Sequence, residues 1–191
     1  RYDTRGHGKS DVIEDTTLAN LGEDVIDIMD ALNIEKAHFC GISMGGITAL
    51  WLGLNAAHRF NSITVANSAA KIGQVDAWIS RADAVEQNGL ADLVKTTHSR
   101  WFSEKFDYQH NALAQRTIQS LAVTPAAGYA ESCRALAQAD LTAEIKNIHW
   151  LTKKELFNNS LTVLVFTFVM GLFFFGGDAV IAFILKALGM D

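Results

Sequence analysis

The strongest constraint on the fold is a run of 22 residues without a charged side chain, from Leu156 to Gly177. As an α-helix, this run would be about 33 Å long, which matches the hydrocarbon core of a bilayer at about 30 Å. A buried core helix is the alternative, but such helices are rarely apolar on every side over this length. We therefore expect one transmembrane helix. Lys153 and Lys154 precede the run, and the positive-inside rule places that end in the cytoplasm.

The run separates two regions of different composition. Residues 1–149 contain 13 Lys and Arg against 18 Asp and Glu, a net charge of −5, whereas residues 150–191 contain three of each. An acidic first region without a basic patch argues against a nucleic-acid partner. Cys40 and Cys133 are too few and too far apart for a disulfide framework or a paired metal site, which favours a cytoplasmic first region. We expect no cofactor and no metal.

Short apolar runs alternate with helical patterns in residues 1–74. Apolar residues recur at spacings of three and four from Thr17 to Leu32, which predicts an amphipathic helix. The pattern then predicts, in order, a strand, a glycine-rich turn, a helix and a second strand, at residues 37–40, 41–46, 47–54 and 62–66. Residues 1–10 predict a strand end followed by a loop. This alternation is typical of an α/β fold with a parallel sheet.

The region that follows has a different character. No strand candidate occurs between Val75 and Ile145, where Ala, Leu, Gln and Glu favour helices. A helical stretch of this length after a strand indicates a cap over the sheet. We therefore expect a partial core at 1–74, a helical cap at 75–148, and an amphipathic segment with a membrane helix at 149–191.

A candidate catalytic motif lies between the first predicted strand and the next helix. The run from Gly41 to Gly45 reads G-x-S-x-G, with Ser43 at its centre. In a strand–turn–helix context, small residues two before and two after the serine allow a sharp turn that exposes its hydroxyl. We expect Ser43 to be a nucleophile and the backbone N–H of Met44 to stabilise an oxyanion. A purely structural turn is the alternative.

Several segments carry a family resemblance. The run from Asp3 to Ser10 resembles the D-x-R-G-x-G-x-S loop of the α/β-hydrolases. The segments RYDTRGHGKSD, HFCGISMGG, ITVANSAAKIG and RWFSEKFDY are similar to those of the 3-oxoadipate enol-lactonases of the β-ketoadipate pathway. The similarity extends from Arg1 to about Ile148. It implies hydrolysis of a small enol-lactone carboxylate, or more broadly of a small enol-lactone or ester, by a Ser-His-Asp triad.

The catalytic acid and base of that family are missing from the expected place. They would follow the cap, where the apolar run begins instead, and a second oxyanion donor would precede Arg1. We therefore expect a hydrolase cut at both ends, with a partial sheet and almost no activity. His7, in the glycine-rich loop, is the best-placed replacement base. Asp178 matches the acid loop only superficially, so Ser43 and Met44 alone carry over.

The last part of the chain resembles a different family. The run from His149 to Leu156, followed by one apolar span, is similar to SecE, the small subunit of the Sec protein translocase; Leu151 stands where that family usually has proline. The resemblance implies an inner-membrane anchor that contacts lipid, and a translocase channel subunit, through residues 150–188. Trp150 and Glu155 would anchor the interfacial helix against that subunit. A generic membrane anchor is the alternative.

The two resemblances meet without a linker near residue 149. Natural fusions usually join complete domains through flexible segments, so we expect a chimeric chain. The SecE-like reading implies an alternative function, as a single-span subunit that supports protein translocation.

Overall fold

A computed structural model describes residues 1–146, 154, 157, 161, 164–170 and 175 of the chain. The chain divides into two compact units, Arg1–Asn147 and Ile148–Asp191. The elements of the first unit are, in chain order, α1 (Leu18–Ala31), β1 (Ala37–Ile42), α2 (Met44–Asn55), the 3-10 helix η1 (Ala57–Arg59), β2 (Phe60–Ala66), α3 (Val75–Asn88), α4 (Ala91–Trp101), α5 (Ala112–Ala122), α6 (Ala126–Gln138) and α7 (Thr142–Lys146).

The predicted order of strands and helices is confirmed in the first unit. Each strand is longer than its pattern indicates, and β1 includes Gly41 and Ile42, which were expected in the turn. The strand end predicted within residues 1–10 is wrong, because that segment is a loop in the structure. Its backbone hydrogen bonds are local, such as the one from Gly6 N to Asp11 O at 2.7 Å.

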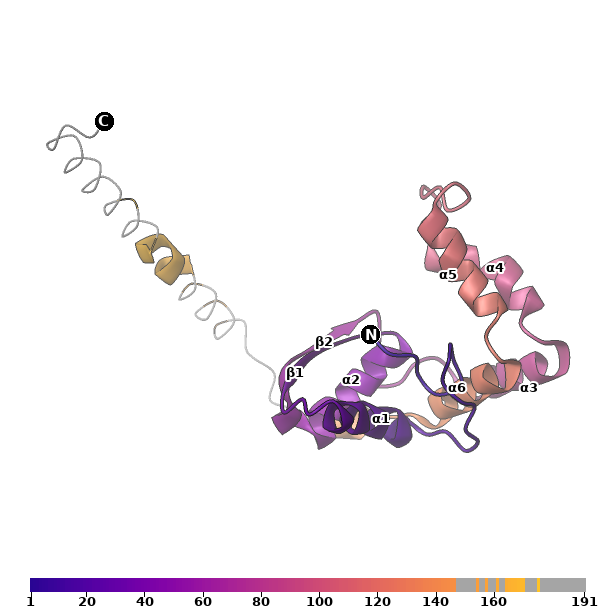
Figure 1. Ribbon diagram of the computed structural model, residues 1–191, viewed down its shortest axis with the longest axis horizontal. Coiled ribbons are helices and arrows are strands. Elements are labelled where there is room, and N and C mark those ends of the chain that lie inside the picture. Colours follow the sequence, from indigo (N-terminus) through magenta and orange to yellow (C-terminus); the bar gives the residue numbers. More distant parts are fainter. Residues whose placement is uncertain (147–153, 155–156, 158–160, 162–163, 171–174, 176–191) are drawn as a thin grey trace, which may run out of the picture. The chain divides into compact units, whose positions relative to one another are not determined.

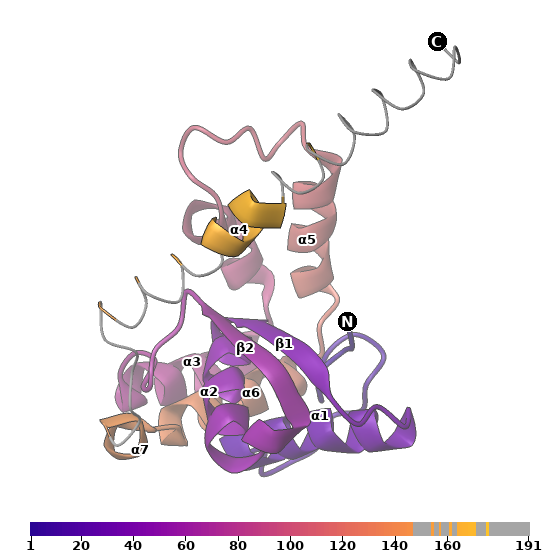
Figure 2. The same cartoon turned by 90° about the vertical axis from the view of Figure 1, so that its left-hand side faces the viewer.

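In the described part of the chain, the sheet consists of β1 and β2, which are parallel, with Cys40 opposite Thr64. Helices α1 and α2 cover one face of it. Val25, Met29 and Leu52 form a buried cluster there, packed against apolar side chains of both strands. Figures 1 and 2 show how the crossover helix α2 lies against the sheet.

Helix α1 is defined by its N-terminal cap and its apolar stripe. The Thr17 hydroxyl accepts a hydrogen bond from the Asn20 backbone N–H, and the Asn20 side chain accepts one from the Thr17 N–H. This reciprocal pair satisfies two backbone donors that the helix leaves unpaired. Its buried positions, Leu18, Leu21, Val25 and Met29, follow the predicted spacing.

Four of the described helices after β2 form two pairs. Helix α3 packs along α6, and α4 packs along α5 as a hairpin that projects away from the other pair (Figure 1). Helix α6 also contacts the N-terminal loop. A Cβ built on Gly6, whose φ is +74°, would lie only 2.6 Å from the Cα of Gly128, so both positions require glycine. This close backbone contact fixes the loop against α6.

The second unit is described at few positions. Residues 164–170 are helical, and Leu164, Phe166 and Phe168 are each 66% exposed. Among the residues that the structure describes, none belongs to a helix long and apolar enough to cross a membrane. Most of the predicted span, Leu156–Gly177, lies outside the described residues.

Candidate functional site

Ser43 occupies a sharp turn between β1 and α2. Its backbone has φ 53° and ψ −115°, a combination that non-glycine residues seldom adopt and that costs about 1–3 kcal/mol. β1 ends at the preceding residue, and α2 begins at Met44. The Ser43 side chain is exposed. The structure therefore presents this hydroxyl at the carboxyl end of a strand.

Two glycines make this turn sterically possible. A Cβ on Gly41 would collide with the carbonyl oxygen of Gly45, and a Cβ on Gly46 would lie 2.4 Å from Ser68 Cβ. By contrast, a Cβ on Gly45 would meet no atom within 4 Å. The expectation of a small residue two positions before Ser43 therefore has a steric basis. On the C-terminal side of Ser43, the position that requires glycine is Gly46 and not Gly45.

The backbone of Ser43 is held on both sides. Its N–H donates to Ala66 O at 3.1 Å, at the end of β2. Its carbonyl accepts from the N–H groups of Gly46 and Ile47, at 2.8 and 3.0 Å, and from the Ser68 hydroxyl at 2.8 Å. These bonds offset the strain of the turn. Sequence reasoning missed Ser68, since only the parallel pairing of β1 with β2 brings it close.

Met44 is the first residue of α2, so its N–H has no partner within the helix. In the described part of the chain, no hydrogen bond uses this N–H. It lies at the positive end of the helix dipole. These properties are those required of a donor to a developing oxyanion.

A groove of about 840 Å³ lies beside the turn. It is lined by all of β1, by Met44 and Gly45, by apolar side chains of α1, and by His7 from the N-terminal loop. The His7 Nδ1 atom lies 3.2 Å from the carbonyl oxygen of Arg5. Because a carbonyl only accepts, Nδ1 carries the proton in this contact and Nε2 is the basic nitrogen.

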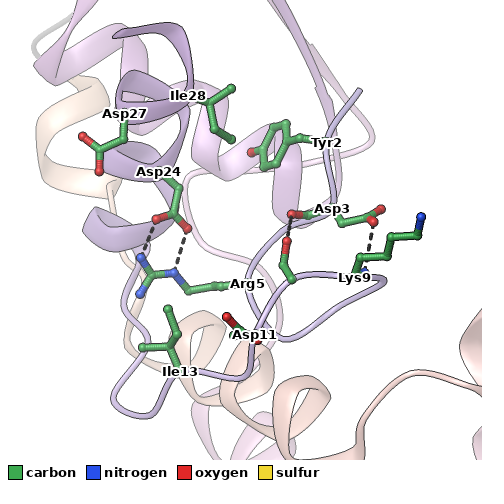
Figure 3. A pocket seen from close by; sticks show the side chains of 10 residues that line it. Tyr2, Asp3, Arg5, Lys9, Asp11, Ile13, Asp24, Asp27 and Ile28 are labelled. Carbon is green, nitrogen blue, oxygen red and sulfur yellow. Dashed lines mark hydrogen bonds and ion pairs between the residues drawn. The ribbon is translucent and has the colours of Figure 1, made fainter. Parts of the chain in front are cut away.

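An ion pair fixes the loop that carries His7. Arg5 binds both carboxylate oxygens of Asp24 on α1, at 2.7 and 2.5 Å (Figure 3). The hydrogen bond to Asp24 is the main cause that raises the Arg5 pKa. Asp3 stabilises the other side of this loop. Its carboxylate accepts a hydrogen bond from the Lys9 backbone N–H, and its carbonyl oxygen accepts one from the Ser10 hydroxyl. These groups line a smaller pocket of about 320 Å³.

Within the described residues, no hydrogen bond joins Ser43 to a histidine. His38 Nδ1 lies 2.7 Å from the Ser62 hydroxyl on the exposed face of the sheet. Among the helices after β2, His98 of α4 stacks on Tyr108 with ring centres 4.7 Å apart, and His110 contacts Asp107. The structure therefore places Ser43 and Met44 together but forms no nucleophile–base pair in this part of the chain.

Other candidate residues are not described. Trp150, Lys153, Glu155 and Asp178 lie outside the residues that the structure describes, whereas Lys154 is exposed. In the described ranges, no group of three or more His, Cys, Asp or Glu side chains is arranged to hold a metal ion.

Two family models match different parts of the chain. The model for the alpha/beta hydrolase fold matches residues 1–140, and that for the SecE/Sec61-gamma subunits of protein translocation complex matches residues 139–189. 3-Oxoadipate enol-lactonase 1 of Acinetobacter baylyi is 73% identical over 147 residues, 77% of this chain. Enol-lactonase 2 of the same organism is 43% identical over 148 residues, also 77% of this chain. The chain spans 55% of the length of each relative.

Solved structures give the same fold for the first unit. The enol-lactonase from Burkholderia xenovorans LB400 aligns with a TM-score of 0.74 at 35% identity, over 78% of this chain and 58% of its own. A hydrolase from Pseudomonas aeruginosa aligns with a TM-score of 0.73 at 36% identity, over 78% of this chain and 57% of its own. The predicted α/β-hydrolase fold is confirmed by these matches. With its serine turn and a family match over residues 1–140, the chain belongs to the alpha/beta hydrolase fold family.

Proposed function

We propose that the chain is a hydrolase of small enol-lactones or esters, in which Ser43 is the nucleophile. The observation that carries this proposal is the backbone conformation of Ser43, which is held at φ 53° between strand β1 and helix α2. Such strain is retained where the surrounding contacts enforce it, and it aims the hydroxyl away from the sheet. The Met44 N–H is the proposed oxyanion donor.

The proposed substrate class follows from the relatives, two of which are named 3-oxoadipate enol-lactonases. In the reaction, Ser43 Oγ attacks the lactone carbonyl and loses its proton to a base. The ring C–O bond breaks, and the leaving enolate gains a proton to become a ketone. Water then cleaves the acyl–Ser43 ester and releases a carboxylic acid.

The reaction needs a base that accepts the proton of the Ser43 hydroxyl. His7 lines the groove and presents a basic Nε2, but no hydrogen bond connects it to Ser43 among the described residues. Loss of triad members costs on the order of 10⁴ to 10⁶ in turnover. We therefore propose slow turnover, with His7 as the candidate base in the described part of the chain.

The enol-lactone of 3-oxoadipate, incubated with the full chain, tests this function. Opening of the lactone above the buffer rate should be lost in Ser43→Ala and kept in Ser62→Ala, which removes an exposed serine on β2. A rate for Ser43→Ala equal to that of the parent would overturn the proposal, as would no rate above buffer for the parent.

A second candidate function concerns the other end of the chain. We propose that residues 149–191 anchor it in the inner membrane with the first unit in the cytoplasm, as a SecE-like subunit that contacts lipid and a translocase channel subunit. The family match at residues 139–189 supports this proposal. So do the large apolar side chains exposed on the helix at 164–170, which water would disfavour. In this division, residues 1–74 are the hydrolase core and 75–148 its cap.

Extraction of membranes with alkaline carbonate tests the anchor. The full chain should remain in the membrane pellet, and Val165→Lys combined with Phe168→Asp should shift it to the supernatant because two charges oppose insertion. A matched variant, Ser62→Ala with Asn61→Ala, should behave like the parent. Recovery of the parent in the supernatant would exclude the anchor.

A further inference from the structure

The segment between β2 and α3 is held by residues that follow α6. The backbone N–H of Leu141 donates a hydrogen bond of 2.9 Å to the carbonyl oxygen of Ala70. At the next position, Lys71 Nζ lies 2.9 Å from the carboxylate of Asp140. Ser68, whose hydroxyl binds the backbone carbonyl of the serine turn, lies two residues before Ala70 in the same segment. The segment that holds the turn is therefore itself fixed at two neighbouring residues.

A single carboxylate joins this segment to α7. One oxygen of Asp140 accepts a hydrogen bond from Lys71 Nζ, and the other accepts one from the backbone N–H of Thr142, the first residue of α7, at 3.0 Å. The hydrogen bonds from Thr142 and Lys71 lower the pKa of Asp140, so this carboxylate is charged at neutral pH. The Lys71 and Asp140 side chains are 41% and 43% exposed. A pair this exposed adds little to stability, so its main effect is to fix the geometry of the two segments.

Apolar packing joins the same residues to the start of α2. Leu141 is 8% exposed and belongs to a buried cluster that includes Ile47 of α2. Met44, the proposed oxyanion donor, packs against this cluster, as do Ala70 and Ile145. The cluster therefore connects Leu141 both to α2 and to the segment after β2.

We propose that Asp140 and Leu141 are positioning residues for the Ser43 nucleophile, because they hold the segment that carries Ser68, and Ser68 holds the strained turn. Asp140 lies in the overlap of the two family matches, 1–140 and 139–189, and Leu141 lies in the second match alone. The first residues of the SecE match thus set the reactivity of the serine. The kinetic consequence rests on the proposed hydrolase function, whereas the effect on the turn does not.

The rate at which p-nitrophenyl acetate acylates Ser43 in the full chain tests the kinetic consequence. Lys71→Ala and Asp140→Asn should each lower the limiting rate about threefold, the size expected of one partly exposed ion pair. The ester concentration that gives half of the limiting rate should not change. The double variant should be no slower than either single variant, since each already breaks the pair. Lys71→Arg keeps the pair and should match the parent.

Lys95→Ala is the matched control for this experiment. It breaks an ion pair of the same length with Asp92, on α4. Since that pair has no connection to the segment after β2, the acylation rate of Ser43 should equal that of the parent.

Hydrogen exchange, followed by NMR, reads the turn without any reaction. The amides of Gly46 and Ile47 both donate to the carbonyl oxygen of Ser43. They should exchange about threefold faster in Lys71→Ala than in the parent, since a looser turn opens these bonds more often. The amide of Ala56, at the C-terminal cap of α2, should exchange at the same rate in both.

Three results would overturn the positioning role. The first is acylation of the parent at Ser43 with equal rates in Lys71→Ala and Asp140→Asn. The second is unchanged exchange at Gly46, and the third is equally accelerated exchange at Gly46 and Ala56, which would show a general loosening of the fold. If the parent is not acylated, the proposed hydrolase function fails. Faster exchange at Gly46 alone in Lys71→Ala would then still support the role of Asp140 in holding the turn.

Discussion

The Ser68 hydroxyl donates a 2.8 Å hydrogen bond to the backbone carbonyl oxygen of Ser43. The two residues follow the ends of the paired strands β1 and β2, so the pairing of the sheet brings them together. The carbonyl of Ser43 also accepts the first hydrogen bonds of α2. Ser68 therefore helps to hold the strained turn on which the proposed nucleophile lies.

Ser68→Ala should lower the free energy of unfolding by about 1 kcal/mol, the usual net value of one such hydrogen bond. Urea unfolding followed by tryptophan fluorescence would measure the change. Ser62→Ala serves as a control, since its hydrogen bond to His38 lies on the exposed face of the sheet. Equal stability of Ser68→Ala and the parent would show that the turn does not depend on this bond.

The glycines after Ser43 should respond in opposite directions to a methyl group. Gly46→Ala places a Cβ 2.4 Å from Ser68 Cβ, and this overpacking should cost about 1–3 kcal/mol. In Gly45→Ala the new Cβ meets no atom within 4 Å, and the helix should gain up to about 1 kcal/mol. The same unfolding assay measures both. A larger loss for Gly45→Ala than for Gly46→Ala would contradict the steric account.

The ion pair between Arg5 and Asp24 should stabilise the N-terminal loop. The side chains are only 14% and 26% exposed, so Asp24→Ala should cost about 2 kcal/mol by leaving a partly buried guanidinium without its partner. Lys95→Ala is the matched control, because Lys95 and Asp92 are 73% and 86% exposed, and it should change stability by less than about 0.5 kcal/mol. Similar losses for both variants would argue against a special role of burial.

The two cysteines should react with thiol reagents at very different rates. Cys40 is exposed on β1, whereas Cys133 of α6 is 2% exposed and burial raises its pKa to about 11. At pH 8, Ellman's reagent should modify one thiol rapidly, and Cys40→Ser should abolish this fast phase. Two equally fast thiols would contradict the packing of α6.

The Cys133 thiol should also make the free energy of unfolding depend on pH. The pKa of Cys133 is higher in the folded chain than its ordinary value of 9.0. Its neutral form therefore contributes stability that is fully present below pH 9 and is lost as the pH rises towards 11. Cys133→Ala should reduce this alkaline loss of stability, measured by urea unfolding between pH 8 and pH 11. An unchanged alkaline loss in Cys133→Ala would show that other groups cause it.

Local features of the chain could be predicted from the sequence, and contacts between distant segments could not. The serine turn was predictable because its strand, its small residues and its helix are consecutive. Ser68 and the Gly6–Gly128 contact escaped prediction because the fold, and no local pattern, brings these residues together. The predicted membrane span lies mostly outside the described residues.

The most direct test of Ser43 as the nucleophile is to treat the full chain with p-nitrophenyl acetate. Peptide mass spectrometry then identifies the residue that carries the acetyl group. One acetyl group should appear on Ser43, since its hydroxyl is exposed beside the N-terminus of α2. The adduct should persist in Ser62→Ala and disappear in Ser43→Ala. No acylation of Ser43 in the parent, or an adduct of equal yield at another residue in Ser43→Ala, would contradict Ser43 as the nucleophile.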